Sequence, residues 1–454
     1  MKMIAQKKFE IVDQKNFTDI SGDSNPIHID EILSRRLLFG EPVVHGMHLV
    51  MWALDELIKS YNISYSSIQN IQANFHKGVL LNREICLKSE IIPDKFILRI
   101  YEEDDLATTI HVQFGQLVNY AESLSPMSPA VVNPTPILKG SLALMYDSTN
   151  TSIIFPRLSS VIPDFQLSVL LTTTRLVGME CPGLNSLYSS LNLTFDPIAI
   201  GIPQMEYEAS NFDELNGTTI KVKGPGFTGN LRAYLRPEPI KQPGALYLKT
   251  LVNPEEFKSQ NAIIIGGSRG MGEVVAKLLS FGGAKVTFTY NKGMEDAIKI
   301  QKEIWDSGFS CSVLPYDCES PHRISGEEPF THLYYFATPR ITTKRNGSFS
   351  DSLFQKYCKY YVTGFFETIK AVGVQKILYP STVSLETNNY ELPEYRAAKA
   401  AGEEICRQMN GLKFKIYSPR LPRLLTDQTS WFFSIKTDLI ESIMLNHIRE
   451  MEKL

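Results

Sequence analysis

The 454-residue sequence has few of the features that would place it in a secreted, membrane or metal-binding class. Its cysteines form no CxxC pair, so we expect reduced thiols in a cytoplasmic protein and no zinc site. These cysteines are Cys86, Cys181, Cys311, Cys318, Cys358 and Cys406. Residues 1–11 contain no long apolar stretch, so we expect no signal peptide. No apolar run reaches the length that spans a membrane.

The sequence also has little excess charge of either sign. Its formal net charge is −3, with 21% charged and 43% hydrophobic residues. A near-neutral balance offers no electrostatic footprint for nucleic acid or for an anionic membrane. The length is sufficient for two or three domains, each with an ordinary core.

A candidate acid–base pair lies in the stretch Gly22–Asp30. Asn25 followed by a proline is a strong helix start, and the pattern predicts one helix that Gly40 ends. Asp23 then lies just before this helix and His28 in its first turn. A carboxylate and an imidazole this close can share one water, as adding or removing water across a double bond requires. The alternative is a turn aspartate and a surface histidine.

An unusually apolar helix is predicted directly downstream, over Met47–Ile58, after the segment Glu41–Gly46. The first turn of a helix has N–H groups without intrahelical acceptors. Such N–H groups can polarise a carbonyl as an oxyanion hole does, and Gly46 is the candidate position.

The ordered string Ser21-x-Asp23-x-Asn25-Pro26-x-His28-x-Asp30, Phe39-Gly40, Pro42-x-x-His45-Gly46-Met47 closely resembles the MaoC-like, R-specific enoyl-thioester hydratases and dehydratases. The resemblance implies a hotdog fold, in which an antiparallel sheet wraps a long apolar helix. It also implies that Asp23 and His28 are catalytic, that Asn25 orients the loop and that Gly46 polarises the thioester carbonyl. A homodimer or higher homo-oligomer is implied as well.

Residues 1–120 are predicted to form one hotdog, and residues 140–237 a second, degenerate half. Alternating strands are expected over 68–75, 84–91, 96–101 and 108–117. A Ser- and Pro-rich linker is expected over 121–139. In the second half, an apolar helix over 165–177 is predicted to end at Gly178 and to be followed by a turn and a strand over 182–195. No histidine lies between His111 and His322, so this half cannot supply its own pair. We expect a double hotdog with one site; the alternative is an unrelated structural domain.

Beyond a second linker over 236–244, the pattern alternates between apolar strands and helices. This alternation is typical of an α/β Rossmann-type domain with a doubly wound parallel sheet, which we predict over 256–454. A strand over 262–265 is followed by a glycine-rich turn over 266–272 and a helix over 273–281. Such a turn lets backbone N–H groups approach a pyrophosphate.

The spacing Gly266-x-x-x-Gly270-x-Gly272 and the later Tyr395-x-x-x-Lys399 resemble the short-chain dehydrogenase/reductase family. The resemblance implies that Tyr395 donates a proton to a ketone that receives hydride, while Lys399 lowers the pKa of the phenol and binds the ribose. A partner serine is either Ser381, with the better chemistry, or Thr382, with the better spacing. The implied cofactor-binding residues are Gly266, Ser268, Arg269, Gly270, Met271, Gly272 and Lys399.

NADP(H) is the expected cofactor. An acidic residue after the second strand would bind a ribose diol and repel a phosphate. This sequence has Lys292 there, and Arg269 lies in the glycine turn, so two cations favour NADPH. Either residue could instead be a solvated surface charge. The resemblance assigns Asp317 to the adenine.

Three positions depart from the reductase family. Residues 335–338 replace an Asn-Asn-Ala-Gly string, Tyr361 replaces the asparagine that relays protons, and Arg420 replaces the glycine of a Pro-Gly pair. We therefore predict a bifunctional enzyme that reduces 3-oxoacyl thioesters and dehydrates 3-hydroxyacyl thioesters on acyl carrier protein or CoA. The alternatives are a hydratase with a degenerate reductase domain and a non-catalytic NADP-binding or carrier-docking module.

Overall fold

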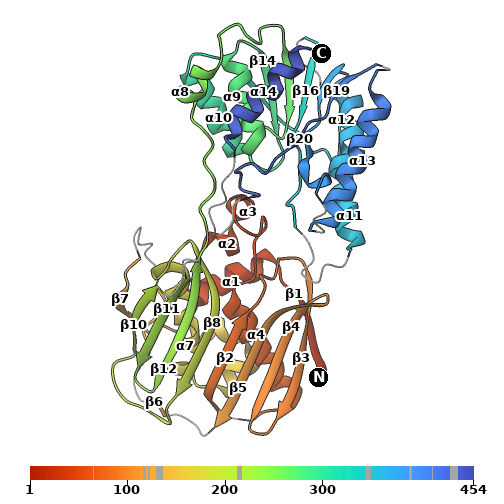
Figure 1. Ribbon diagram of the computed structural model, residues 1–454. Coiled ribbons are helices and arrows are strands. Elements are labelled where there is room, and N and C mark those ends of the chain that lie inside the picture. The colour runs from red at the N-terminus through yellow and green to blue at the C-terminus, as the bar shows by residue number, and fades with distance from the viewer. Residues whose placement is uncertain are drawn as a thin grey trace. The chain divides into compact units, whose positions relative to one another are not determined.

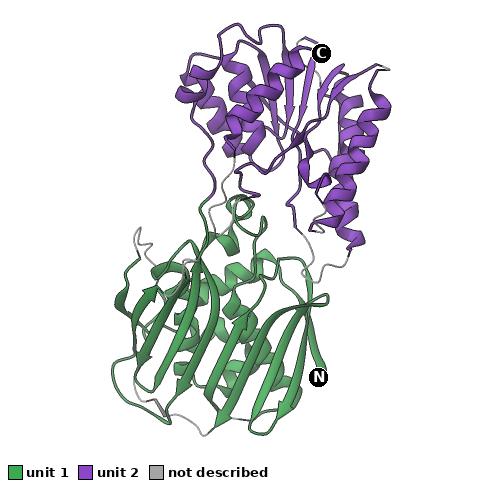
Figure 2. Cartoon of the chain, in the orientation of Figure 1, with its two compact units in different colours: residues 1–238, 431–433 green, residues 239–430, 434–454 purple. Residues whose placement is uncertain are grey.

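The computed structural model describes residues 1–64, 66–115, 119–120, 123–128, 136–211, 217–324, 326, 328–342, 349–387, 391–411, 413–429 and 438–454. Parts of the linker predicted over 121–139, and the end of the strand predicted to reach residue 117, lie outside these residues. The described chain divides into two compact units, one spanning Met1–Glu238 and the other running from Pro239 to Leu454 (Figure 2).

The first half of unit 1 places a long helix against five antiparallel strands. These elements are β1 (Lys2–Lys8), α1 (Ile11–Ser21), α2 (Pro26–Ile29), α3 (Glu31–Ser34), α4 (Gly46–Tyr61), β2 (Ser67–Phe75), β3 (Glu84–Ile92), β4 (Lys95–Glu102) and β5 (Asp105–Gly115). A short strand, β6 (Asn119–Tyr120), follows. The strand order is β1-β3-β4-β5-β2. The predicted central helix and four strands are therefore present, with shifts of a few residues at their ends.

The single helix predicted from Pro26 to Gly40 is wrong. The chain forms two short helices, α2 and α3, because Asp30 ends the first and caps the second. Its Oδ1 accepts the N–H groups of Ile32 at 2.9 Å and of Leu33 at 2.8 Å. A side chain that satisfies first-turn N–H groups starts a helix at its own position, so the helical pattern is interrupted there.

The second half repeats this arrangement in the same sheet. Its elements are β7 (Lys139–Ala143), α5 (Ser148–Ile154), α6 (Pro156–Val161), α7 (Asp164–Arg175), a π-helical segment η1 (Leu176–Glu180), β8 (Ser186–Phe195), β9 (Ile198–Ala199), β10 (Gln204–Asn211), β11 (Gly217–Gly224) and β12 (Phe227–Leu235). The order β8-β12-β11-β10-β7 mirrors that of the first half, and antiparallel pairing of β2 with β8 joins them into ten strands. α4 and α7 lie on the same face of this sheet (Figure 1).

The helix predicted to end at Gly178 continues past it. α7 passes into η1, and Gly178 lies inside this wider turn. A Cβ at Gly178 would lie 2.3 Å from Oδ1 of Asp23, so the glycine is required by a close approach rather than by a helix end. Pi-helical turns of this kind occur frequently at functional sites.

One hydrophobic core serves both halves of unit 1. It includes Leu54 on α4 and Leu170 on α7, both fully buried, and side chains from the strands of each half. The Gln166 amide accepts the N–H of Ile68 and donates to its carbonyl, both at 2.8 Å. Removing either half would expose this shared core to water, so the halves are parts of one folding unit.

Unit 2 is built on a six-stranded parallel sheet with the order β15-β14-β13-β16-β17-β19. One core holds α9, α10 and α14, and another holds α11, α12 and α13, so helices cover both faces. Its sheet strands are β13 (Asn261–Ile265), β14 (Lys285–Tyr290), β15 (Ser312–Pro315), β16 (His332–Tyr335), β17 (Lys376–Leu378) and β19 (Lys415–Tyr417). Its main helices are α9 (Gly270–Phe281), α10 (Met294–Asp306), α11 (Asp351–Cys358), α12 (Phe365–Val372), α13 (Pro393–Met409) and α14 (Ile440–Glu452). The smaller elements are α8 (Ala245–Leu248), η2 (Lys249–Leu251), η3 (Lys359–Gly364), β18 (Ser381–Thr382), η4 (Val383–Leu385) and β20 (Arg420–Leu421).

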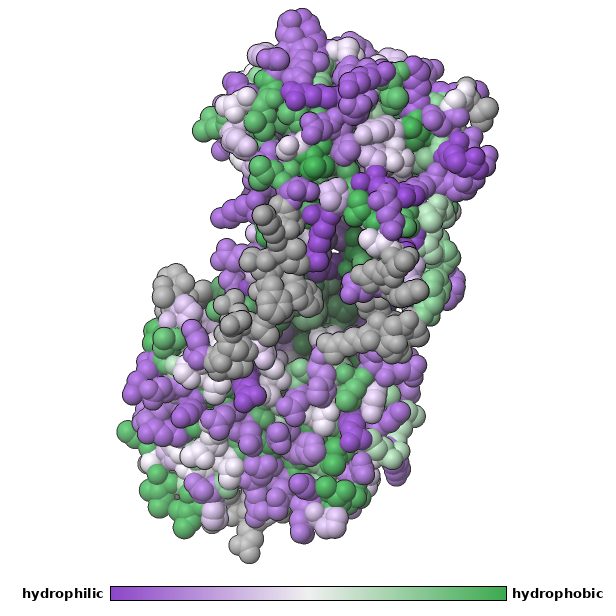
Figure 3. Space-filling view, in the orientation of Figure 1, coloured by the Kyte–Doolittle hydropathy of each residue, from purple (hydrophilic) through white to green (hydrophobic). Residues whose placement is uncertain are grey.

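The predicted linker over 236–244 is shorter than expected. Arg236 is 5% exposed and belongs to unit 1, while Ala245 and Leu248 of α8 pack into the core of unit 2, ahead of the expected start at 256. None of the helices in the described residues is long and apolar enough to cross a membrane. Hydrophobic residues on the face shown in Figure 3 are scattered among hydrophilic ones.

Candidate functional site

Asp23 is held in a buried, largely hydrogen-bonded position. It follows Gly22, which ends α1 in the left-handed conformation at φ 70°. The side chain is 2% exposed. Its Oδ1 accepts the backbone N–H of Asn25 at 3.2 Å, and its Oδ2 accepts the hydroxyl of Thr174 at 2.7 Å. The partner of Oδ1 is thus close in sequence, whereas the partner of Oδ2 comes from the second half of unit 1.

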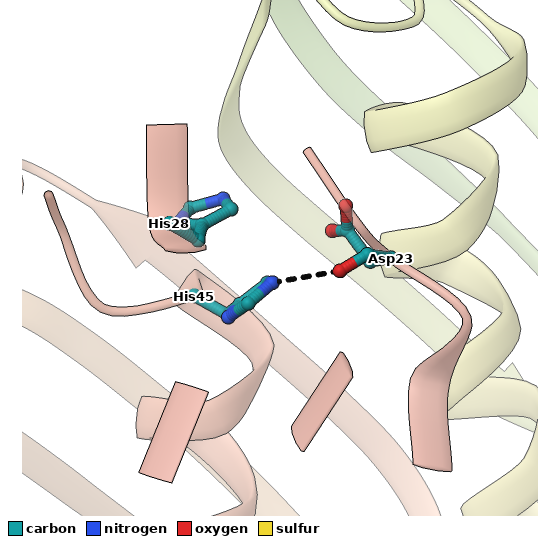
Figure 4. Close-up of side chains that lie close together, drawn as sticks. All are labelled: Asp23, His28 and His45. Carbon is teal, nitrogen blue, oxygen red and sulfur yellow. Dashed lines mark hydrogen bonds between the residues drawn. The ribbon is translucent and has the colours of Figure 1, made fainter. Parts of the chain in front are cut away.

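His28 lies on α2 with one ring nitrogen engaged. Its Nδ1 is 2.8 Å from the carbonyl oxygen of Val43, which can only accept, so Nδ1 carries the proton. In the neutral ring, Nε2 then has a lone pair available to act as a base. An atom of Asp23 and an atom of His28 lie within 4.8 Å of each other, which is close enough for both to contact one water or substrate group (Figure 4).

Burial moves the pKa values of the pair in opposite directions. It raises the pKa of Asp23, against the opposing effects of His28, Thr174 and Asn25. It lowers the pKa of His28, and the nearby guanidinium of Arg236 lowers it further, while Asp23 opposes both. Burial therefore acts against the ion pair in this site, because it disfavours the charged form of each group. The two shifts bring the pKa values of the carboxyl and the imidazole toward each other, and groups with similar pKa values can exchange a proton readily, as acid–base chemistry requires.

Asn25 and Gly46 lie where the sequence predicted them, around this pair. Asn25 is 1% exposed, and its side chain caps α2 by accepting the N–H of Ile27 at 3.3 Å. Gly46 is the first residue of α4, where N–H groups lack intrahelical acceptors. A Cβ at Gly46 would lie 3.0 Å from the ring of Phe75, so a larger residue would have to displace that ring.

Two residues of the site were missed by sequence reasoning. Thr174 and Gly178 lie on α7 and η1 of the second half, far in sequence from Asp23. The amide of Asn25 also donates to the carbonyl of Gly178 at 3.4 Å. A threonine and a glycine in an apolar helix carry no motif of their own. Only the pairing of the two halves shows that they surround the carboxylate.

Asp23, His28 and His45 satisfy the proximity that a metal site needs, with ligand atoms within 4.8 Å of one another. Their orientation does not fit one. The two imidazoles stack at 3.8 Å between centroids with an angle of 25°, and each nitrogen of His45 faces an oxygen of the protein. Lone pairs on stacked rings do not converge on one point, as tetrahedral coordination requires. The arrangement fits acid–base chemistry better.

In unit 2, the glycine turn between β13 and α9 has the backbone that a phosphate cradle needs. Gly266 and Gly270 have φ values of 80° and 59°, which favour glycine. A Cβ at Gly272 would lie 2.2 Å from the carbonyl oxygen of Gly266. Ser268 lies in this turn and is buried, and Met271 lies in the first turn of α9 and is half-buried. These residues would fit a pyrophosphate at the start of α9.

The charged candidates near this turn differ in their surroundings. Nη1 of Arg269 is 3.7 Å from Oδ2 of Asp427, so the arginine is already paired with a carboxylate. Lys292 is exposed just after β14. Asp317 is half-buried after β15 and accepts the N–H of Glu319 at 2.9 Å. Lys292 is therefore the more available cation for a phosphate.

Thr382 lies beside Tyr395 of α13, and its side chain opposes the effect of burial on the pKa of the phenol. The Ser381 hydroxyl instead donates to Oε1 of Glu403 at 2.5 Å. Arg420, at the position of the expected glycine, binds the same Glu403 at 2.7 Å. The structure thus places Thr382, and not Ser381, beside the candidate proton donor.

Lys399 lies on α13 four residues after Tyr395, as the spacing predicted, but its charge is not directed at the phenol. Its Nζ donates to the carbonyl of Pro380 at 2.7 Å and lies 4.0 Å from the ring centroid of Tyr361. Burial lowers the pKa of Lys399 to about 7 and raises the pKa of Tyr395 to about 12. The expectation that Lys399 lowers the pKa of Tyr395 is therefore wrong for this structure.

Tyr361, which takes the place of the expected relay asparagine, is fully integrated into the core of unit 2. Its hydroxyl lies 2.5 Å from the hydroxyl of Thr338, another of the departing positions. Its ring meets that of Tyr395 edge-on, with centroids 5.7 Å apart. Two of the departing positions, Thr338 and Tyr361, thus contact each other, and Tyr361 lies beside Tyr395 and Lys399.

Comparisons with known proteins identify the class of the N-terminal region. Residues 4–95 match the family model described as "MaoC like domain". That segment contains Asp23, His28 and Gly46. The comparison with curated proteins finds no match.

Solved structures of short-chain dehydrogenases and reductases are similar to part of the chain. A dehydrogenase/reductase from Sinorhizobium meliloti 1021 is 18% identical over 41% of this chain and 79% of its own, with a TM-score of 0.34. A short-chain dehydrogenase from Burkholderia cenocepacia J2315 in complex with NADP is 18% identical over 38% and 78%, with a TM-score of 0.33. An alcohol dehydrogenase from Thermococcus sibiricus, complexed with 5-hydroxy-NADP, is 18% identical over 42% and 90%, with a TM-score of 0.36.

Proposed function

We propose that the protein is a bifunctional enzyme of acyl-thioester metabolism. Unit 1 removes water from an R-3-hydroxyacyl thioester to give a trans-2-enoyl thioester, or adds it in reverse. Unit 2 reduces the corresponding 3-oxoacyl thioester. The observation that carries the proposal is the pair of a buried Asp23 and a half-buried His28, in which Nδ1 of His28 is bonded to Val43 and Nε2 keeps its lone pair. The family match over residues 4–95 supports it.

The lone pair on Nε2 of His28 supports one assignment of the roles in dehydration. In this assignment His28 takes the proton from the α carbon through Nε2, and Asp23 in its protonated form gives a proton to the departing hydroxyl, which leaves as water. The Cα–H and Cβ–O bonds break and a double bond forms. The net proton content of the pair is unchanged, since one proton enters His28 as another leaves Asp23. Backbone N–H groups near Gly46 stabilise negative charge on the thioester oxygen.

The mirrored strand order supports a double hotdog with a single site. Each half has one long apolar helix and five strands in the same relative order. His28 comes from the first half, while Thr174 and Gly178 come from the second, so the degenerate half completes the site instead of duplicating it. This arrangement explains why the second half needs no histidine of its own.

NADP(H) is the cofactor we propose for unit 2. The turn at Gly266, Gly270 and Gly272 would hold its pyrophosphate, and Lys292 would meet its 2′-phosphate. The bound nicotinamide supplies hydride chemistry. Tyr395, whose pKa is raised to about 12, keeps its proton at neutral pH and can give it to a ketone oxygen. The parallel order with helices on both faces supports a doubly wound sheet of the Rossmann type.

A second candidate function is an enoyl-thioester hydratase whose unit 2 is inactive. The observation that favours it is the position of Lys399, which is bonded to Pro380 and lies over the ring of Tyr361 rather than stabilising a phenolate. Thr338 and Tyr361 both occupy positions that depart from the reductase family and contact each other, which also favours an inactive unit 2.

Two assays with the purified protein separate these functions. Crotonyl thioester should lose its enoyl absorbance as water adds, with or without NADPH. Acetoacetyl thioester should oxidise NADPH if unit 2 is active, and each assay should be run with both CoA and carrier-protein forms. Hydration without any NADPH oxidation would select the second candidate. Absence of hydration would refute both.

Coupling both steps in one chain would raise the local concentration of the shared 3-hydroxyacyl intermediate.

A further inference from the structure

His45 lies beneath the candidate acid–base pair and contacts both of its members. It is fully buried. Its Nε2 is 3.0 Å from the backbone carbonyl oxygen of Asp23, and its ring stacks on that of His28 at 3.8 Å between centroids (Figure 4). One side chain thus contacts the main chain that carries the carboxylate and the face of the imidazole.

The position of His45 is itself fixed by Gln14 on α1. Oε1 of Gln14 lies 3.0 Å from the backbone N–H of His45 and 2.9 Å from its Nδ1. Gln14 is also fully buried. These contacts connect α1, which leads into Asp23, with the start of α4, which leads out of His45. These contacts place one buried imidazole between the two segments.

A neutral imidazole has one N–H, and both nitrogens of His45 face oxygens. Burial and the adjacent His28 hold the pKa of His45 well below its usual range, so the ring is neutral. The carbonyl of Asp23 has two lone pairs, and the Thr18 hydroxyl donates to one of them at 2.9 Å. A proton on Nε2 of His45 satisfies the second, and the carbonyl is then held from two sides. The contact between Nδ1 and Oε1 of Gln14 is then not a hydrogen bond, so Gln14 holds His45 through its backbone N–H.

We propose that His45 is a positioning residue for the hydration and dehydration chemistry proposed above, on which this inference rests. It holds the Asp23 carbonyl through Nε2–H and provides the surface that fixes the plane of the His28 ring. Neither task transfers a proton to substrate. Both set the distance between the carboxylate and Nε2 of His28, and reacting groups displaced by about 1 Å lose on the order of a hundredfold in rate.

His48 is a matched control on the same helix. It is also buried, at 1% exposure, and stacks on Phe17 at 4.6 Å, the residue whose ring lies 5.0 Å from that of His45. Among the described residues, neither ring nitrogen of His48 has a hydrogen-bond partner. A His48→Phe change therefore removes a buried imidazole from the same aromatic layer without touching the acid–base pair.

The test compares three variants of the full chain by crotonyl-CoA hydration kinetics. His45→Phe keeps a ring under His28 and removes the hydrogen bonds, whereas His45→Asn keeps a hydrogen-bonding group and removes the ring. We expect kcat to fall about 10- to 100-fold in both. KM should stay within about threefold, because positioning affects the chemical step more than binding. His48→Phe should stay within about threefold of wild type in both constants, the size of a small indirect effect.

Two further readouts separate this inference from the proposed function and from simple misfolding. The imidazole NMR signals of His28 should shift in the two His45 variants but not in His48→Phe, whether or not the substrate is the right one. Thermal unfolding midpoints identify any variant that is not folded. Wild-type activity that is lost in Asp23→Asn but retained in both His45 variants would overturn the inference and leave the proposed function intact. Equal losses in His48→Phe would also overturn it. No hydration by wild type would instead refute the proposed function.

Discussion

Burial shifts the pKa values of titratable groups in the candidate sites of both units, but the consequences for the proposed chemistry differ. In unit 1, burial favours a neutral Asp23 and a neutral His28, which are the forms that can donate and accept a proton. In unit 2, burial favours a neutral Tyr395, which can donate, but it also lowers the pKa of Lys399 to about 7 and so reduces its charge. In unit 1, burial thus supports the neutral forms that the proposed chemistry uses, whereas in unit 2 it weakens the positive charge that the proposed reduction would use.

The largest expected effect tests the unit 1 side of this comparison. We predict that Asp23→Asn or His28→Ala lowers hydration of a crotonyl thioester by at least about a hundredfold, the usual worth of a positioned acid or base. NADPH-dependent reduction should be unchanged in both variants, which serves as the control for folding. Near-normal hydration in both would show that the pair is not the catalytic one.

The contribution of the second half can be tested at Gly178. A Cβ there would lie 2.3 Å from Oδ1 of Asp23, so Gly178→Ala must push the carboxylate or the π-helical turn aside. We predict a loss of hydration rate of about 10- to 100-fold, since a displacement near 1 Å costs on that order. Circular dichroism on heating should still show a cooperative transition. An unchanged rate would mean that the second half merely supports the fold.

Thr174 offers a smaller, pH-dependent test. Its hydroxyl favours the ionised form of Asp23, so Thr174→Val should raise the pKa of that carboxyl further. The pair then loses its shared proton at higher pH, and the alkaline limb of the pH–rate profile should shift upward. The shift should be about one pKa unit, because a hydrogen bond to the ionised carboxyl contributes roughly 1.5 kcal/mol. Thr173→Val is the neighbouring control, because the Thr173 hydroxyl donates to Leu170 instead. An equal shift in that variant would contradict the assignment.

The smallest expected effect concerns Lys399 and sharpens the unit 2 side of the comparison. Because the pKa of Lys399 is about 7, most of this group is neutral at pH 8. A bound dinucleotide carries negative charge, which raises the pKa of a nearby amine and makes it take up a proton. We predict uptake of up to about one proton per site when NADPH binds at pH 8, by linkage. Titration calorimetry in buffers of different ionisation enthalpy measures this uptake, and Lys399→Met should abolish it. Identical heats in all buffers would show that no proton is taken up and would contradict the prediction.

Much of the fold could be predicted from sequence because its signals are local. Alternation marked β3 and β4, and a glycine-rich turn after a buried strand marked the start of unit 2. The errors arose where a contact distant in sequence overrides a local signal. Gly178 was interpreted as a helix end although it makes room for Asp23, and Asp30 divides a helix that periodicity predicts as continuous.

Likewise, only part of the candidate site could be predicted from the sequence. Asp23, Asn25, His28 and Gly46 lie within one ordered motif, and the structure brings them together. Thr174 was not identified, because its role depends on the pairing of two repeated halves. In unit 2, the spacing placed Tyr395 and Lys399 on one helix. It could not show which way Nζ of Lys399 points, because side-chain direction depends on the surrounding Tyr361 and Pro380.

The central claim, that one chain contains two independent active sites, is tested most directly by Tyr395→Phe. This change removes only the hydroxyl of the candidate proton donor in unit 2, which has a core separate from that of unit 1. Both activities are measured on the same preparation, with acetoacetyl thioester plus NADPH and with crotonyl thioester alone. The prediction is that NADPH oxidation falls by at least about a hundredfold, as for loss of a general acid, while hydration stays at the wild-type rate. Reduction that survives the change, or hydration that falls with it, would contradict the claim.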